Sequence, residues 1–337
     1  MKRLVAFAVA VLLAGCAGVQ SSAGADGAES LRIANLGGLF LIVAVLVYLF
    51  VLVLLVLAVR RGRAQRRDGA GVQGEPQAGG EGNWHLALVS FAGVTAAILF
   101  GLSLATWLTD RSIAQAAAAP VLEIEVIGHQ WWWEIRYKDP VAGRELRTAN
   151  ELVIRAGRVS HVTLHSQDVI HSLWIPNLAG KQDLIPGRSS DLALKPLHVG
   201  QFRAQCAEFC GIQHAQMALT VNAVSDGDFA HWYEQGLKTP QPPGEGPPFA
   251  GYSLFLGRQC ASCHNISGTP ASGQVAPDLS HVGSRPTLAA GALANTPANL
   301  DRWIADPQGV KPGTNMPKVP LTPEERSAVV AYLETLK

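Results

Sequence analysis

The part of the sequence richest in metal-binding side chains is a short stretch, Cys206-Ala-Glu-Phe-Cys-Gly-Ile-Gln-His-Ala-Gln-Met. It offers two thiols, an imidazole and a thioether, and these are ligands that suit copper. A turn of this length can direct Cys206 and Cys210 to one point, where their thiolates bridge two metal ions. His214 and Met217 follow closely enough to complete the coordination. The spacing therefore predicts a copper site.

Two other uses of this stretch have to be weighed against copper. A disulfide between Cys206 and Cys210 is sterically possible, but it would require neither His214 nor Met217. The whole chain has only three methionines, so a methionine beside two cysteines and a histidine is informative. Zinc is the second alternative, but a thioether is not among its usual ligands. The combination of side chains favours copper.

A second stretch, Gln259-Cys-Ala-Ser-Cys-His, contains the C-x-x-C-H signature of covalent c-type haem attachment. We expect thioether bonds from Cys260 and Cys263 to hold the porphyrin, and His264 to bind the iron. The alternatives are a zinc site or a redox-active cysteine pair. A redox pair is expected in a thioredoxin-like context, and no such pattern surrounds this motif.

The sixth iron ligand is expected well downstream of the attachment motif. Met316, in Gly313-Thr-Asn-Met-Pro, is the methionine in that position. His281 is the competing candidate, but it follows the attachment motif too soon. A histidine–methionine pair raises the potential of a haem, which suits the delivery of electrons to copper.

The other histidines are not expected to bind metal. Those in or beside predicted strands are His161, His165 and His198. We interpret His129 as structural.

The N-terminus reads as a targeting segment. Lys2 and Arg3 precede an apolar run, and Leu-Ala-Gly-Cys at 13–16 resembles a lipobox. This pattern predicts a lipoprotein-type signal peptide over 1–15 and lipidation of Cys16. An ordinary signal peptide with an incidental cysteine is the alternative.

Two further apolar runs, about 36–59 and 86–108, are long enough to cross a bilayer, which takes about 20 residues as a helix. We expect them to form a transmembrane hairpin within 16–119. The loop between them begins with a group of arginines, and by the positive-inside rule it is cytoplasmic. These arginines are Arg60, Arg61, Arg63, Arg66 and Arg67. Both flanking parts of the chain are therefore expected on the outer side.

The composition agrees with a membrane protein that carries small metal-binding domains. Hydrophobic residues make up 48% of the chain and charged residues 16%, which favours membrane segments. A formal net charge of +1 gives no indication of a nucleic-acid partner. Five cysteines in 337 residues are too few for a disulfide framework.

The rest of the chain divides into two domains joined by a linker. Short alternating runs over 120–237 predict an antiparallel β-sandwich or barrel. A Pro- and Gly-rich segment, 238–248, is a semi-rigid linker. Residues 249–337 form a second small domain that ends in a helix, with Thr322 as N-cap and Glu325 completing a capping box.

The copper stretch has the pattern C-x-E-x-C-x3-H-x2-M, which resembles the binuclear copper A site of cytochrome c oxidase subunit II. Other segments match the same family, namely Gly128-His-Gln-Trp-Trp-Trp133, Asp168-Val-Ile-His171-Ser-Leu-Trp and Ile185-Pro-Gly-Arg188. The family usually has tyrosine where this chain has Trp132, a departure that leaves the copper ligands unchanged. The resemblance extends from the first membrane helix to about Val224. It implies a cupredoxin-like Greek-key barrel anchored by a two-helix transmembrane hairpin.

Carried over residue by residue, the resemblance implies that Cys206 and Cys210 bridge two copper ions. His171 and His214 would each bind one copper, and Met217 would be a weak ligand to one of them.

The resemblance also implies roles for Glu208 and Trp131. Glu208 would coordinate the other copper through its backbone carbonyl, while its side chain would reach a magnesium ion shared with subunit I. Trp131 would be the exposed aromatic through which electrons arrive from cytochrome c.

The C-terminal domain resembles an all-α class I cytochrome c. Together the two resemblances imply one component of a proton-translocating cytochrome c oxidase in the bacterial cytoplasmic (inner) membrane, with the metal domains on the periplasmic face. Electrons would pass from an external cytochrome c or another donor to haem c, then to copper A, then to subunit I. Subunit III is a further expected partner. Oxygen reduction itself belongs to the partner subunit, and no catalytic residue for it is expected here.

Two other functions remain open at this point. A copper-A-containing nitric oxide reductase subunit would present the same residues, because the terminal acceptor lies in another chain. A stand-alone membrane electron carrier would need no partner subunit. A quinol oxidase subunit II shares the hairpin but lacks copper ligands, so Cys206 and Cys210 argue against it.

Overall fold

Two long helices make up one of the two units of this chain. The computed structural model describes residues 18, 20–21, 24–67, 81–116, 123–139 and 143–337. Helix α2 spans Ala28–Arg67 and helix α3 spans Glu81–Ala116. Both are long and apolar enough to cross a membrane, and their apolar side chains are largely exposed. The expected spans, 36–59 and 86–108, lie within these helices.

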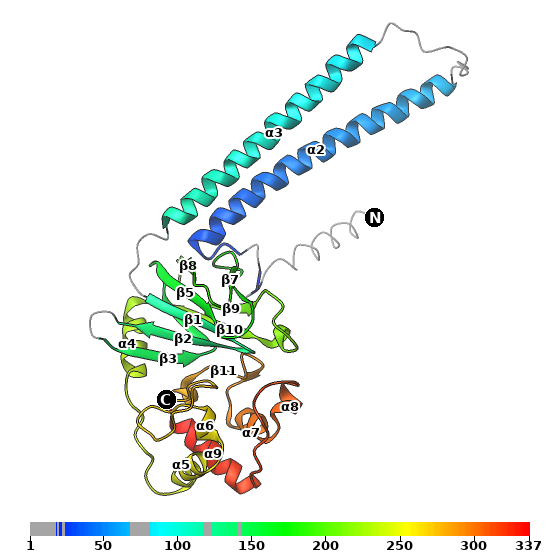
Figure 1. The fold of residues 1–337 in the computed structure, drawn as a ribbon. Helices are drawn as coiled ribbons and strands as arrows, with labels where there is room; N and C mark the ends of the chain where they lie inside the picture. Colours follow the sequence, from blue (N-terminus) through cyan, green and yellow to red (C-terminus); the bar gives the residue numbers. More distant parts are fainter. Residues whose placement is uncertain (1–17, 19, 22–23, 68–80, 117–122, 140–142) are drawn as a thin grey trace. The chain divides into compact units, whose positions relative to one another are not determined.

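The second unit begins with a sandwich of two five-stranded sheets (Figure 1). One sheet has the strand order β3-β2-β1-β5-β8 and the other β4-β10-β9-β6-β7. The strands of the first sheet are β1 (Glu123–His129), β2 (Trp132–Lys138), β3 (Glu145–Ala149), β5 (Ser160–Ser166) and β8 (Ser190–Leu194). Those of the second are β4 (Glu151–Arg155), β6 (His171–Trp174), β7 (Gln182–Leu184), β9 (Gly200–Cys206) and β10 (Ala218–Val224).

The predicted sandwich is confirmed, but the expectation that its strands are all antiparallel is wrong. Strand β1 pairs parallel with β5, and β10 pairs parallel with β4. Local alternation of apolar residues indicates which face of a strand is buried but not which strand lies beside it, because pairing is set by long-range packing. Helix α4, Asp226–Gly236, follows the last strand and packs Phe229 on the sandwich core.

The core of the sandwich extends up to the predicted copper stretch. Its fully buried side chains include Trp133, Ile135, Leu152 and Leu164. The same cluster contains the side chains of Cys206, Cys210 and Met217. The sulfur atoms are therefore packed as part of the core, and a close-packed interior leaves them little freedom to move.

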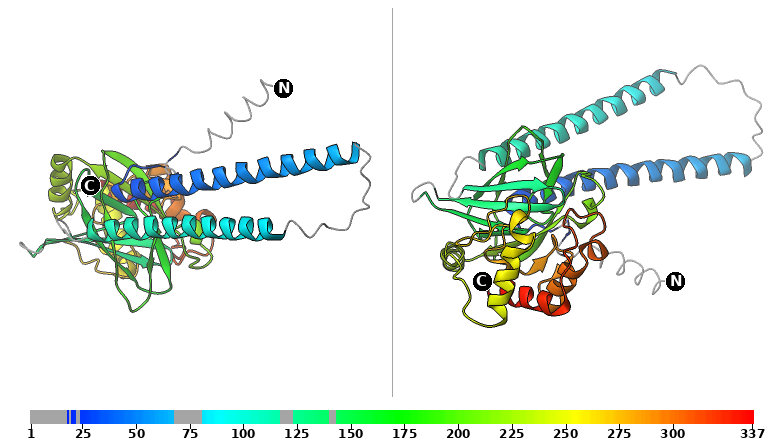
Figure 2. Two further views of the ribbon diagram at one scale, coloured as in Figure 1. Left: turned by 90° about the horizontal axis from the view of Figure 1, so that it is seen from above. Right: turned by 60° about the horizontal axis from the view of Figure 1, so that its bottom comes forward.

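The C-terminal part of the second unit is largely helical and has its own core. It contains α5 (Pro247–Gly257), α6 (Cys260–Cys263), α7 (Pro297–Ala305), α8 (Pro307–Val310) and α9 (Pro323–Thr335). Two 3-10 turns, η1 (His214–Gln216) and η2 (Val282–Ser284), and a short ribbon of β11 (Thr287–Leu288) with β12 (Leu293–Ala294) complete the unit. Helices α5 and α9 lie against each other (Figure 2).

The predicted capping box of the last helix is confirmed. The Thr322 hydroxyl accepts from the Glu325 amide, and the Glu325 carboxylate accepts from the Thr322 amide at 2.9 Å. The apolar face of α9 is buried against the haem-motif region, with Val329, Val330 and Leu333 in the core. The signal peptide over 1–15, Cys16 and most of the loop between the long helices lie outside the described residues.

Candidate metal and haem sites

The predicted copper stretch is a loop that joins two neighbouring strands. It begins at the end of β9 with Cys206 and finishes at Met217, just before β10. The Cys206 amide donates to the Met217 carbonyl at 3.0 Å and closes the base of the loop. His171 comes from β6, which pairs with β9. The sheet therefore brings residues 35 positions apart to the same place.

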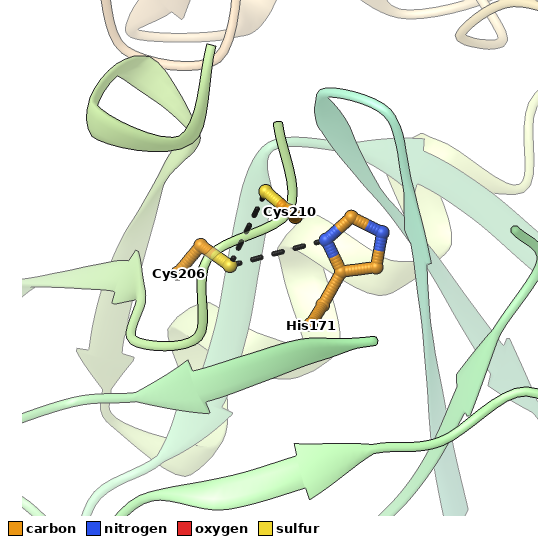
Figure 3. Close-up of side chains that lie close together, drawn as sticks. All are labelled: His171, Cys206 and Cys210. Carbon is orange, nitrogen blue, oxygen red and sulfur yellow. Dashed lines mark hydrogen bonds between the residues drawn. The ribbon is translucent and has the colours of Figure 1, made fainter. Parts of the chain in front are cut away.

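The two cysteine sulfur atoms are in contact inside the core but are not bonded to each other. Their separation is 3.7 Å, and both thiols are free. A disulfide needs about 2.05 Å, so the structure does not contain the alternative bond. A metal–sulfur bond is about 2.3 Å, and a single ion can therefore reach both sulfur atoms at this spacing. Figure 3 shows Cys206, Cys210 and His171 pointing toward one another.

The remaining predicted ligands lie at two ends of the sulfur pair. His171 Nδ1 is 3.9 Å from Cys206 Sγ, and the Glu208 carbonyl oxygen is 3.2 Å from the same sulfur. At the other end, His214 Nδ1 and Met217 Sδ lie 3.7 Å and 3.9 Å from Cys210 Sγ. Two thiols flanked at both ends by further donors fit two metal ions better than one.

The ionisation of the thiols also fits a cationic occupant. The hydrogen bond with Cys210 lowers the pKa of Cys206 to about 3, while contact with Cys206 and burial raise the pKa of Cys210. Two neighbouring thiols in an apolar core cannot both lose their protons when nothing compensates the charge. Bound cations would remove that conflict, since metal binding releases thiol protons.

Two residues hold the His171 ring in its orientation. Asp168 Oδ1 lies 2.8 Å from His171 Nε2, which leaves Nδ1 to face the sulfur atoms. Burial alone would lower the pKa of His171, but the bonds to Asp168 and Cys206 raise it. On the other side of the ring, a Cβ at Gly128 would come within 2.8 Å of His171 Cδ2. Hydrogen-bonded carboxylates of this kind fix the orientation of metal-binding histidines.

The roles of Asp168 and Gly128 in orienting His171 were not predicted from the sequence. A carboxylate three residues before a predicted ligand is a local signal that would have identified Asp168. Gly128 has no such signal, because the approach of its backbone to His171 exists only in the folded sandwich.

The predicted haem ligands line one cavity of about 450 Å³, which lies in the range of about 300–1,000 Å³ typical of ligand pockets. Cys260 and Cys263 occupy one turn of helix, and a spacing of three places both thiols on the same face. His264 and Met316 line the same cavity. His281 is not among the lining residues, and its Nδ1 contacts the Lys337 carbonyl oxygen at 3.2 Å.

Two features of the cavity fit a haem. His264 Nδ1 donates to the Pro277 carbonyl at 2.7 Å, so Nε2 keeps its lone pair for a metal. Arg285 lines the cavity at 7% exposure, and its Nε has no hydrogen-bond partner among the described residues. A buried guanidinium with a free donor suits a carboxylate such as a haem propionate. Arg285 was not singled out from the sequence, because its burial depends on the tertiary fold.

Trp131 lies where the two candidate sites meet. It occupies the turn between β1 and β2 and lines the haem-motif cavity. Its indole Nε1 donates to the Cys210 carbonyl at 3.0 Å, and the Gln130 amide group donates to the same oxygen at 2.8 Å. One side chain is thus in contact with both sites.

The histidines judged to be structural have partners outside the sulfur cluster. His129, His161, His165 and His198 lie near Glu134, Asp191, Glu125 and Asp26, respectively. The His129 ring also stacks on Trp132, with centroids 4.2 Å apart.

Two family models match different parts of the chain. The model for the periplasmic domain of cytochrome c oxidase subunit II matches residues 140–224, and the cytochrome c model matches residues 250–337. This chain joins a cytochrome c oxidase subunit II domain to a cytochrome c domain. The subunit II domain and the two long apolar helices together describe a membrane protein with an outward-facing domain.

Individual relatives agree with this assignment. Cytochrome c oxidase subunit 2 of Alkalihalophilus pseudofirmus is 34% identical over 64% of this chain and 61% of that protein. The Bacillus subtilis protein of the same name is 30% identical over 65% of this chain and 64% of that protein. This chain therefore spans less than two thirds of the length of either relative.

A solved structure is also similar to part of this chain. The periplasmic domain of subunit II of cytochrome oxidase from Bradyrhizobium japonicum is 31% identical. The match covers 36% of this chain and 96% of that one, with a TM-score of 0.33.

The close approach of Gly128 to His171 gives a testable consequence. Gly128→Ala should displace the His171 ring and lower copper affinity by about 10- to 100-fold, the range typical of residues that orient metal ligands. The measurement is competitive copper titration of the purified chain. Gly227→Ala, at a helix position where the added methyl meets no atom closer than 3.9 Å, should leave the affinity unchanged. Equal affinities of the two variants would contradict this role of Gly128.

The cavity lining leads to a second expectation, for the haem. Met316→Ala should abolish the low-spin absorption of a histidine–methionine haem, while the haem stays covalently attached through Cys260 and Cys263. Visible spectra and haem staining of denatured protein would measure the two properties separately. His281→Ala is the matched control and should retain the low-spin spectrum. If the spectra of the two variants are reversed, His281 is the ligand instead.

Proposed function

We propose that this chain is the subunit of a haem–copper cytochrome c oxidase that accepts electrons at a haem c and passes them through a binuclear copper A site to a partner subunit. Oxygen reduction coupled to proton pumping would take place in that partner. The observation that carries the proposal is the position of Trp131, which lines the haem-motif cavity and donates to the carbonyl of Cys210. An electron carrier needs such contact between its centres, whereas two unrelated metal sites do not.

When bound, a thiolate-bridged copper pair and a haem each take up and release single electrons without a proton donor or a substrate pocket. The contribution of this chain is to hold the ligands. Cys206 and Cys210 would hold the coppers together with His171, His214, Met217 and the Glu208 carbonyl.

Burial makes this arrangement rigid. His171 is fully buried and Met217 is 1% exposed, so their positions are fixed by packing on all sides. Rigid ligands keep the geometry nearly constant between oxidation states and exclude water, which lowers the barrier to electron transfer.

In the cytochrome c domain, Cys260 and Cys263 would attach the haem, and His264 and Met316 would bind its iron. The guanidinium of Arg285 would pair with a propionate, which would supply the partner that its Nε otherwise lacks. The apolar lining, including Phe255, Leu300 and Leu333, would keep water from the porphyrin.

Charged residues at the surface of the subunit II domain could contact a partner subunit. Glu208 is partly exposed, and its carboxylate lies 3.4 Å from the Lys181 ammonium, which also contacts Asp183. We propose that Glu208 exchanges this pairing for a magnesium ion shared with subunit I. Lys181 was not singled out in the sequence analysis. The proposed partners are subunits I and III and an external cytochrome c or another electron donor. The proposed location is the bacterial inner membrane, with Cys16 as a lipid anchor.

Copper stoichiometry tests the binuclear assignment. The purified full-length chain should contain two coppers for each covalent haem, as measured by elemental analysis and haem absorption. Cys206→Ser should lose both coppers, because each ion depends on both bridging sulfur atoms, and should keep its haem. Cys260→Ser should have the opposite effect, with haem attachment impaired and copper retained. A single copper in the unaltered chain, or unchanged copper in Cys206→Ser, would contradict the assignment.

The identity of the partner subunit tests the wider function. The tagged chain is expected to co-purify from native membranes with a haem–copper subunit, and the complex should consume oxygen when supplied with reduced cytochrome c. Consumption of nitric oxide without oxygen uptake would instead identify a nitric oxide reductase. Isolation of the chain without any partner would favour a stand-alone carrier.

A further inference from the structure

The interface between the cytochrome c domain and the subunit II domain centres on the segment that precedes Met316. Lys311 donates to the Trp131 carbonyl at 2.9 Å, and Asn315 donates to the Gln130 carbonyl at 2.9 Å. From the opposite side, Gln213 of the copper loop donates to the Pro312 carbonyl. The loop that carries one predicted metal ligand is therefore bonded to the turn and the loop that surround the other site.

Lys311 is the unusual member of this interface. Only 3% of it is exposed, and no carboxylate in the described part of the chain lies within ion-pairing distance. Burial lowers its pKa to about 8. Placing an ammonium without a carboxylate partner in a protein interior is unfavourable, and an apolar side chain such as methionine would avoid that cost.

The bonds that Lys311 makes explain what the ammonium does there. Its Nζ also donates to the Ala289 carbonyl at 3.3 Å, so it links the 289–290 turn of the cytochrome c domain to the backbone of Trp131. The Ala218 amide donates to the Ala290 carbonyl at 3.0 Å beside this point. Lys311 lines the same cavity as Trp131 and His264. An ammonium has three donors, and here it bonds both domains at the wall of the cavity.

We propose that Lys311 is a positioning residue that fixes the backbone of Trp131 against the haem cavity and keeps the two domains docked for electron transfer within one chain. This inference rests on the proposed function for its electron-transfer consequence, but not for the docking itself. The residue binds no metal. It acts through the placement of Trp131, whose indole bonds to Cys210.

The test compares two lysine variants of the full-length chain loaded with copper and haem. Lys311→Met removes the donors and keeps an unbranched side chain that is one atom shorter. Lys318→Met makes the same change at an exposed position of the same loop. After photochemical reduction of the haem, the rate of electron transfer to copper should fall by about tenfold or more in Lys311→Met, because small displacements of a reacting group have large effects on rate. The rate should be unchanged in Lys318→Met.

Hydrogen exchange provides the readout that does not depend on electron transfer. In Lys311→Met, amide exchange in 129–133 and 287–292 should become faster, while exchange in the cores of both domains stays as in the unaltered chain. Lys311→Arg keeps the charge and several donors, and should recover part of the rate and of the protection.

The outcomes separate the two proposals. If both exchange and rate in Lys311→Met match those of the unaltered chain, the positioning role is wrong. A slower rate with unchanged exchange would also overturn it, since the charge alone would then act through the potentials of the two centres. If the unaltered chain transfers no electron from haem to copper, the proposed function fails, while the exchange data still decide whether Lys311 docks the domains.

Discussion

The contact between the thiols of Cys206 and Cys210 inside an apolar core is the constraint on which the rest of this structure depends. Two ionisable sulfur atoms 3.7 Å apart cannot both be charged in such a place without cations between or beside them. The fold surrounds the pair with the donors that a cation needs, at both ends. It also satisfies the Cys210 carbonyl with two hydrogen bonds, from Trp131 and Gln130. The site is therefore held by the backbone of the sandwich as well as by its side chains.

The position of the copper loop determines which segments lie next to the candidate metal site. The turn between β1 and β2 carries Trp131 onto the copper loop, and the loop around Met316 packs on the outer side of the same turn. The two candidate centres thus share one structural element instead of facing each other across solvent. In the proposed electron carrier, the two domains would need no diffusional encounter, and the rate of electron transfer would depend on how firmly Trp131 is held.

Short local patterns in the sequence were enough to single out the candidate ligand segments. The copper stretch, the C-x-x-C-H motif and the Met316 loop each depend on residue types at short spacing, and the structure places each predicted group at one of two sites. The capping box at Thr322 and Glu325 formed as predicted because it needs only neighbouring backbone groups. Strand pairing was predicted less well, and the two parallel pairs were missed because nothing local in a strand specifies its neighbour.

What the sequence by itself determined is the set of candidate donors: two thiols, two imidazoles and a thioether for the predicted copper site, and a C-x-x-C-H motif with a distant methionine for the predicted haem. What only the tertiary structure decided is the support for that chemistry. Gly128, Asp168, Arg285 and Lys311 have their roles because residues far apart in the chain meet in space. Most of the predicted ligands could be found from the sequence because they stand in short motifs, although His171 and Met316 join their sites from distant segments. The residues that orient a ligand or hold the two domains together cannot be found from short motifs, because burial and backbone contact are properties of the packed molecule.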